Sequence, residues 1–288
     1  MIEKVTIAII GGSGLYHISA LNDPSEHNLA TPFGKTSAPI ITGTLEGVRV
    51  AFLARHGLGH HLTPTEVPYR ANIYALKSLG VERVISISAC GSLREDYAPG
   101  HIVIPDNIFD HTKNRARSFF ENGLVAHVNV ADPFCKNLSD QVETAVRQTG
   151  ATTHRGGSFI TIEGPRFSTK AESHAFRNWG MSIIGMTAAP EAFLAREAEI
   201  CYSTMAHVTD YDVWHESESP VTVDMVIQTL NKNTHIAQQA IHNLLRGLKP
   251  ERSCQCGQAL STALITDSKV IPSETRKKLD LLAGKYLT

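Results

Sequence analysis

The chain has 288 residues, of which 42% are hydrophobic and 19% charged, a composition that fits a globular protein and excludes a disordered one. Its formal net charge of −1, without a long basic block, argues against a protein that binds nucleic acid through the phosphates. No apolar run approaches the roughly 20 residues that span a bilayer, and the first residues lack the apolar core of a secretion signal. The sequence therefore predicts a cytoplasmic protein without a membrane partner.

The first predicted strand, Val5 to Ile10, leads into the turn Gly11-Gly12-Ser13-Gly14. Glycines let a backbone turn sharply and approach an anion, and the Ser13 hydroxyl adds a donor. The dinucleotide-binding fingerprint needs another glycine where this chain has His17, so the turn does not match a dinucleotide-binding loop.

A predicted hairpin, residues 40–45 and 49–54 around Glu46-Gly47, leads into Arg55 and His56. A forked guanidinium and a titratable imidazole at a strand end suit a phosphate or a sugar. A surface arginine and a histidine at the edge of the core explain the pattern equally well at this stage.

Small and hydroxyl-bearing residues follow the next strand as well. A helix over residues 66–79 precedes a buried strand over 84–88, which leads into Ser88 and Ala89. The polar stretch from Pro105 to Pro133 lacks periodicity, and we interpret it as an irregular excursion that serves an active site or a subunit contact.

The second half alternates helices and strands. Helices are predicted over residues 138–148, 169–178 and 190–199, and the second of these begins with a capping box formed by Thr169 and Glu172. Strands are predicted over residues 152–162 and 182–184. The short strand leads into Gly185, Met186 and Thr187.

Two carboxylates, Asp210 and Asp212, come just after the buried apolar strand Cys201 to Val208. Open α/β sheets bind ligands at the carboxyl ends of their strands. A carboxylate there accepts a hydrogen bond from an exocyclic amine or holds a proton for a ring nitrogen. The alternative is a pair of solvated turn residues, since aspartate is common in turns.

A long amphipathic helix is predicted over 223–245, and a less regular extension from about residue 249 ends in a helix over 274–282. We find no linker, so one domain spans residues 1–288. Cys254 and Cys256 are interpreted as two free thiols in a loop, because no second Cys/His cluster lies near them in the sequence, and no metal site is predicted.

These strand ends share a chemistry. If they converge, their small, hydroxyl and cationic groups form a cup for a tetrahedral oxyanion, with the two aspartates beside it.

The motifs together resemble the trimeric purine nucleoside phosphorylases over about residues 5–245. The resemblance is carried by Ile9-Ile10-Gly11-Gly12-Ser13-Gly14-Leu15, Thr31-Pro32-Phe33-Gly34, Arg55-His56-Gly57, Asn72-Ile73, Ala89-Cys90-Gly91-Ser92-Leu93, Glu163-Gly164-Pro165-Arg166-Phe167 and Gly185-Met186-Thr187. It implies an α/β fold, a single domain with a central mixed, twisted sheet flanked by helices.

The resemblance assigns roles residue by residue. Inorganic phosphate, the co-substrate, is expected at Ser13, Arg55, His56, Ser88, Ala89 and Thr187. Ser13 and Ser88 stand where many relatives carry threonine, and serine keeps the hydroxyl. Met186 is expected against the ribose, Phe167 on the base, Asp210 and Asp212 at the purine, and Ser168 at a position tied to base specificity.

The 5' end of the nucleoside is expected against Val223, Val226 and Ile227, whose spacing also fits a plain core stripe. An apolar wall there suits a methylthio group better than a hydroxyl. The resemblance further implies a homotrimer in which His127 of a neighbouring subunit closes the pocket, while pairing of trimers into hexamers is left open. No cofactor or metal is expected.

The implied reaction is phosphorolysis of S-methyl-5'-thioadenosine to adenine and 5-methylthioribose 1-phosphate. Asp210, with a pKa raised by a dry pocket, is expected as the catalytic group at N7, and Asp212 either orients it or binds the amine. An ionised aspartate accepts from a 6-amino group and rejects a 6-oxo group. A protonated Asp210 donates to O6, so cleavage of 6-oxopurine nucleosides or S-methyl-5'-thioinosine is the alternative, and a non-catalytic nucleoside sensor is the third reading.

Overall fold

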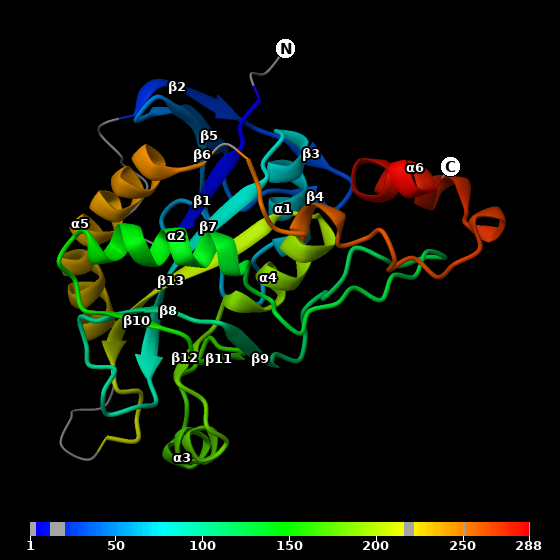
Figure 1. Ribbon diagram of the computed structural model, residues 1–288. Helices are drawn as coiled ribbons and strands as arrows, with labels where there is room; N and C mark the ends of the chain where they lie inside the picture. The colour runs from blue at the N-terminus through cyan, green and yellow to red at the C-terminus, as the bar shows by residue number, and fades with distance from the viewer. Residues whose placement is uncertain (1–3, 12–20, 216–221, 250, 288) are drawn as a thin grey trace.

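The computed structural model describes residues 4–11, 21–215, 222–249 and 251–287. Its centre is a mixed sheet of 11 described strands with helices on both faces (Figure 1). The continuous order is β10-β8-β13-β7-β1-β6-β5-β2, and β9, β11 and β12 branch from it through β7. This confirms the predicted α/β fold with a central mixed sheet flanked by helices.

The strands of this sheet are β1 (Ile7–Gly11), β2 (Asn22–His27), β5 (Ile40–Leu45), β6 (Val48–Ala54), β7 (Arg83–Ser92), β8 (Ile102–Ile104), β9 (Asn107–His111), β10 (Thr153–Arg155), β11 (Ser158–Ile162), β12 (Ile183–Gly185) and β13 (Cys201–Asp210); β3 (Ala30–Thr31) and β4 (Gly34–Lys35) form a separate hairpin. The helices are α1 (Tyr69–Ser78), α2 (Lys136–Arg147), α3 (Lys170–Asn178), α4 (Ala188–Glu197), α5 (Val223–Gly247) and α6 (Ser273–Ala283). None of the helices in the described ranges is both long and apolar enough to cross a membrane.

Four parallel strands, β13, β7, β1 and β6, form the middle of the sheet. Their side chains are buried on both faces, which explains why β1 and β13 read as continuous apolar runs in the sequence. Ile7 and Ile9 pack in one cluster with α2 and α5, while Ala8 and Ile10 pack on the opposite face with α1, α4 and α6.

The predicted helices and strands are present with shifted ends, β7 extending furthest, to Ser92, and two stretches differ in kind. The single strand predicted over residues 152–162 is two strands, because Gly156 and Gly157 have φ angles of +92° and +100° and turn the chain between β10 and β11. The stretch predicted as irregular from Pro105 contains β9, which pairs with β11. The capping box is present: Thr169 Oγ1 accepts from the Glu172 amide, and the Glu172 carboxylate accepts from the Thr169 amide.

His207, in the middle of β13, is fully buried, and neither ring nitrogen has a hydrogen-bond partner among the described residues. Burial lowers the pKa of His207 to about 4, so the ring is neutral at pH 7. An unpaired buried polar group costs about 1–3 kcal/mol. We therefore expect His207→Met to raise the free energy of unfolding in urea at pH 7 by about that amount, whereas His207→Asn, which keeps unpaired polar atoms, should give no gain. A loss of stability in His207→Met would contradict this.

Glu197, near the end of α4, is buried and accepts a hydrogen bond from the Phe119 amide at 2.7 Å. Burial raises the pKa of Glu197 to about 7. The folded state then binds more protons than the unfolded state between about pH 4.5 and 7, so stability is greatest at low pH and falls as the pH rises through that window. The expected loss from this group is about 3 kcal/mol.

The variant Glu197→Gln imitates the protonated form and removes this contribution. We expect the free energy of unfolding of the variant, relative to the parent protein, to increase steadily between pH 4.5 and 8 in urea titrations. A difference between the two proteins that does not change with pH would refute the assignment.

Candidate active site

The carboxyl ends of β1 and β6 lie in one row with the middle of β7, which continues to Ser92. Gly11 of β1 is in register with Ala54 of β6 on one side and with Ile87 of β7 on the other. Arg55, just after β6, and Ser88, within β7, therefore lie at the same level of the sheet, and the Arg55 amide donates to the Gly11 carbonyl at 3.0 Å. Three of the predicted strand ends thus converge; Ser13 itself lies outside the described residues.

The segment Gly185–Thr187 reaches the same place from another direction. β12 pairs antiparallel with β7, with Ile184 opposite Gly91, so the chain beyond it runs back toward Ala89 and Ser88. Thr187 is the N-cap residue of α4, it is buried, and its hydroxyl makes no capping hydrogen bond. The chain is kinked at Ala189, which has non-helical backbone angles and whose amide donates to Thr161 Oγ1 at 3.3 Å, so the regular part of α4 begins after it.

β13 runs parallel to β7 and carries the two aspartates past its end. Ala206 lies beside Ser88 and Asp210 beside Gly91, with one extra residue inserted at Thr209. Such a bulge bends a strand and turns its next side chain. A Cβ atom on Gly91 would lie 2.9 Å from Asp210 Oδ1, so only glycine at this position leaves room for the carboxylate.

Both aspartates are buried, each only 8% exposed, so the interpretation of them as solvated turn residues is wrong. Asp210 Oδ2 accepts from the Thr209 hydroxyl at 2.6 Å, and Oδ1 accepts from the Asp212 amide at 2.8 Å. Burial outweighs these hydrogen bonds and raises the pKa of Asp210 to about 6. The expectation of a raised pKa is confirmed, and the carboxyl group exchanges its proton near neutral pH.

Polar groups without a well-aligned partner gather around Asp212. Burial raises the pKa of Asp212, and the hydroxyls of Ser173 and Ser168 nearby oppose that rise. Yet Asp212 Oδ2 and the Oγ atoms of Ser168 and Ser173 make no hydrogen bond of acceptable geometry within the described chain. Buried polar atoms are normally paired, so this group is ready for the polar edge of a ligand. Ser173, on α3, was not predicted from the sequence.

Arg55 makes a different contact from the one expected. Its guanidinium is fully buried and donates to both oxygens of Glu191, at 2.7 and 2.9 Å, and to Ser86 Oγ at 2.7 Å. The Tyr202 hydroxyl also donates to Glu191. The Arg55 guanidinium, which the sequence predicted to bind phosphate, pairs here with the buried carboxylate of Glu191 on α4. A charged group buried in the core needs a partner of opposite charge. The pair ties α4, and with it Thr187, to β6 and β7.

His56 is a neutral histidine at the same edge. Burial, with a smaller contribution from the charge of Arg55, lowers the pKa of His56 to about 4. Nδ1 lies 2.9 Å from the Leu62 carbonyl, which can only accept, so Nδ1 carries the proton and Nε2 is an acceptor. The ring stacks on His60 at 4.3 Å between centroids.

Arg115 organises the backbone around Met186 and was not predicted from the sequence, where it lies in the irregular stretch after β9. Its guanidinium donates to the carbonyls of Met186 at 2.6 Å, Ala189 at 2.7 Å and Glu163 at 2.7 Å. The Glu163 carboxylate accepts from the Thr65 hydroxyl and the Lys113 amide. Met186 is thereby held against Gly164, where a Cβ would lie 2.6 Å from its sulfur.

The apolar side chains predicted to contact the substrate are more exposed to solvent than the polar ones. Phe167 is 38% exposed, Val223 61% and Ile227 46%, while Val226 is half-buried. The alternative that these residues of α5 form part of the hydrophobic core is therefore wrong for Val223 and Ile227. Exposed apolar side chains of this kind are what a ligand or a partner chain covers.

His127 is also exposed, and its amide donates to the Ala263 carbonyl at 2.8 Å. The segment that carries it extends to the side of the molecule where α6 lies, away from the end of β13 (Figure 1). The fold therefore leaves His127 outside the cluster of strand ends within its own chain.

The cysteine prediction needs a correction. Cys254 and Cys256 were interpreted as two thiols with no other ligand nearby, but the fold brings Cys135 and Cys201 to them, with the four sulfur atoms within 4.8 Å of one another. Cys201 lies 53 residues before Cys254 in the chain, and Cys135 lies further still, so the spacing of nearby cysteines could not reveal the cluster.

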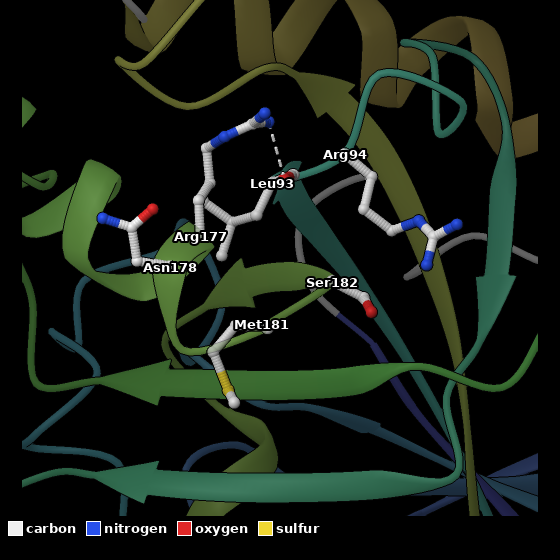
Figure 2. A pocket seen from close by; sticks show the side chains of 7 residues that line it. Leu93, Arg94, Arg177, Asn178, Met181 and Ser182 are labelled. Atoms are coloured by element: carbon white, nitrogen blue, oxygen red, sulfur yellow. Dashed lines mark hydrogen bonds between the residues drawn. The ribbon is translucent and has the colours of Figure 1, made fainter.

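A pocket of about 240 Å³ lies between the end of α3 and the residues just after β7 (Figure 2). Arg177, at the end of α3, and Met181, in the turn after it, line this pocket together with Leu93 and Arg94, and the Arg177 guanidinium donates to the Leu93 carbonyl at 2.8 Å. None of the predicted site residues lines it.

Comparisons with known proteins agree with this geometry. The profile of the Phosphorylase superfamily matches residues 6–246. The chain is 54% identical over 282 residues to an S-methyl-5'-thioadenosine phosphorylase of Geobacter sulfurreducens, covering 98% of this chain and 99% of that one. It is 52% identical to an enzyme of the same name from Chloroflexus aurantiacus, covering 99% of each.

Solved structures show the same fold. A methylthioadenosine phosphorylase from an Antarctic soil metagenomic library superposes with a TM-score of 0.91 at 47% identity, covering 97% of this chain and 99% of that one. A methylthioadenosine phosphorylase from Schistosoma mansoni, solved in complex with adenine, superposes with a TM-score of 0.85 at 34% identity, covering 90% and 96%. The chain therefore belongs to the phosphorylase superfamily, in the family of these S-methyl-5'-thioadenosine phosphorylases.

Proposed function

We propose that this chain catalyses the phosphorolysis of S-methyl-5'-thioadenosine to adenine and 5-methylthioribose 1-phosphate. The observation that carries the proposal is the buried pair Asp210 and Asp212, beside a row of strand ends with anion-binding chemistry. The relatives at about half identity carry this activity in their names. Neither a metal nor an organic cofactor takes part in the proposed reaction.

Phosphate is held beyond the carboxyl ends of β1 and β6, beside Ser88 and Ala89 of β7. The hydroxyls of Ser13, Ser88 and Thr187 and the amide of Ala89 donate to its oxygens. His56, with Nε2 as an acceptor, takes a hydrogen bond from a protonated phosphate oxygen. Arg55 is a positioning residue in this proposal: through Glu191 it fixes α4, and therefore Thr187, relative to Ser88.

The nucleoside lies between this phosphate and the aspartates. Met186 packs on the ribose and Phe167 on the base. As the glycosidic bond breaks, the sugar gains positive charge, which the phosphate oxygens stabilise, and the purine gains negative charge. Correct placement of the two reactants contributes about 7–11 kcal/mol.

Asp210 delivers its proton to N7 of the departing purine. Its pKa of about 6 makes the protonated form accessible near neutral pH and leaves the carboxylate stable after transfer. Asp212 and Ser168 read the 6-position, since their unpaired atoms supply an acceptor and a donor for the polar edge of the base.

A second substrate class follows from the same pKa. A protonated Asp210 donates to the O6 atom of a 6-oxopurine, so S-methyl-5'-thioinosine and other 6-oxopurine nucleosides are the alternative substrates. We favour the 6-amino substrate because Asp212 Oδ2, which is buried and has no hydrogen-bond partner among the described residues, can accept from an amine.

The assembly we propose is a homotrimer, with trimers able to pair into hexamers. The apolar side chains of Val223, Val226 and Ile227 face the methylthio group, and His127 of a neighbouring subunit closes that side of the pocket. Exposure of Val223, Ile227 and His127 in a single chain supports this arrangement. We retain the cytoplasm as the proposed compartment.

The test is the dependence of base release on phosphate. Incubation of the full chain with S-methyl-5'-thioadenosine should release adenine only when phosphate is added, and 5-methylthioribose 1-phosphate should accumulate in equal amount. Release of adenine with free methylthioribose and without phosphate would indicate a hydrolase. Binding of the nucleoside without turnover would favour the sensor.

A further inference from the structure

Four of the five cysteines form one cluster at the end of the sheet opposite to the aspartates. Cys135 is the N-cap residue of α2, Cys201 is the first residue of β13, and Cys254 and Cys256 flank a single glutamine at the start of a short 3-10 helix. Because β13 rises about 3.3 Å per residue, Cys201 and Asp210 are about 30 Å apart. The cluster is therefore separate from the proposed active site.

The sulfur atoms are arranged around a common centre. All four lie within 4.8 Å of one another, and Cys201 Sγ is 3.3 Å from Cys254 Sγ. A Zn²⁺ ion with Zn–S bonds of about 2.3 Å in tetrahedral geometry places its sulfur ligands about 3.8 Å apart. The separations in this structure bracket that value, and all five cysteines of the chain are free thiols.

The surroundings match a negatively charged cluster. The Arg196 guanidinium donates to Cys256 Sγ at 3.7 Å. The Arg252 guanidinium lies against the same loop, since a Cβ on Gly257 would be 2.7 Å from its Nη2, and it interacts with Cys201. Four thiolates around a divalent ion carry two negative charges, which Arg196 and Arg252 partly balance, although Arg252 also pairs with Glu82 at 3.5 Å. Disulfides are neutral and need no such groups.

The shell around the sulfur atoms is apolar. Cys135, Cys201 and Cys256 are buried in the cluster formed by α2, α5 and the inner strands, and Cys254 packs at its edge. Such a shell excludes water from a metal site and protects its thiolates.

We propose that Cys135, Cys201, Cys254 and Cys256 form a closed structural site for a tetrahedral, thiophilic divalent metal ion, for which Zn²⁺ is the best fit. Four sulfur ligands and no open position are typical of structural sites and not of catalytic ones. Each cysteine releases its thiol proton on binding, so one ion displaces four protons.

The site would fasten the C-terminal extension to the sheet. Cys254 and Cys256 lie just beyond α5, whereas Cys135 and Cys201 belong to the α2–β13 layer. A shared ion holds these segments together where the extension leaves the regular fold.

The first experiment measures metal content and thiols in the full chain, purified under reducing conditions without chelator. We expect about one zinc atom per chain, released as a thiol-capping organomercurial is titrated, and in the Co²⁺-substituted protein the strong sulfur-to-cobalt charge-transfer bands of a tetrathiolate site. Absence of metal, with four thiols free or with a mass deficit that shows disulfides, would overturn the proposal.

The second experiment uses matched cysteine variants. Cys254→Ser and Cys256→Ser should lose the bound zinc and the cobalt bands, whereas Cys90→Ala should keep both, since Cys90 is a buried cysteine on β7 outside the cluster. Equal zinc content in all three variants would place the metal elsewhere and would equally refute the site. If the serine variants do not fold, the measurements on the unaltered chain decide alone.

Discussion

Replacing Glu191 by glutamine is expected to lower the free energy of unfolding by about 3–5 kcal/mol, because it leaves the Arg55 guanidinium charged and unpaired in the core. The Glu191 carboxylate accepts hydrogen bonds from Nε and Nη2 of Arg55 and from the Tyr202 hydroxyl. Urea denaturation at pH 7 measures the loss.

The matched control is Asp96→Asn. Its partner Arg94 makes an ion pair of similar length, but the two side chains are 58% and 45% exposed. Exposed pairs contribute roughly 0–1 kcal/mol. A loss in Glu191→Gln as small as in this control would show that the buried pair does not hold α4 to the sheet.

The second large effect is expected on activity. Asp210→Asn removes the proton donor and should lower kcat/KM for S-methyl-5'-thioadenosine by about 10²–10⁴-fold. Because an amide donates as well as accepts, the ratio of kcat/KM values should shift toward S-methyl-5'-thioinosine. Steady-state rates of base release with both substrates at saturating phosphate measure the two effects together.

Asp96→Asn again serves as the control, since it removes a carboxylate outside the proposed site and should leave both rates unchanged. An Asp210→Asn variant with an unchanged substrate ratio would contradict any contact between Asp210 and the 6-position of the base. An unchanged rate would instead remove Asp210 from the proton transfer.

The strand ends could be predicted from the sequence because each follows a buried apolar run. Parallel strands buried on both faces read as short runs without charged residues, such as β1 and residues 201–208 of β13, and open α/β sheets bind ligands at the carboxyl ends of such strands. This is why Arg55, Ser88 and Asp210 could be assigned to one region before their contacts were known.

The details that orient these residues could not be predicted. The bulge at Thr209 and the extension of β7 through Gly91 depend on pairing between β13, β7 and β12, which are far apart in the sequence. Residues 88–91 read as a loop because small residues with weak strand preference are held there by their neighbours.

Long-range charge partners were equally hidden. Glu191 lies 136 residues from Arg55, and Arg115 lies 71 residues from Met186. No local pattern marks either pair, so the sequence predicted a phosphate contact for Arg55 and no role for Arg115. The cysteine cluster was missed for the same reason.

The most direct test of the central claim compares kcat/KM for S-methyl-5'-thioadenosine, adenosine, S-methyl-5'-thioinosine and inosine at saturating phosphate. A buried acceptor at the 6-position and an apolar wall at the 5' position predict the highest value for S-methyl-5'-thioadenosine, with losses on changing either group. A preference for the 6-oxo nucleosides would contradict the proposed role of Asp210 and Asp212 while leaving the phosphate cup intact.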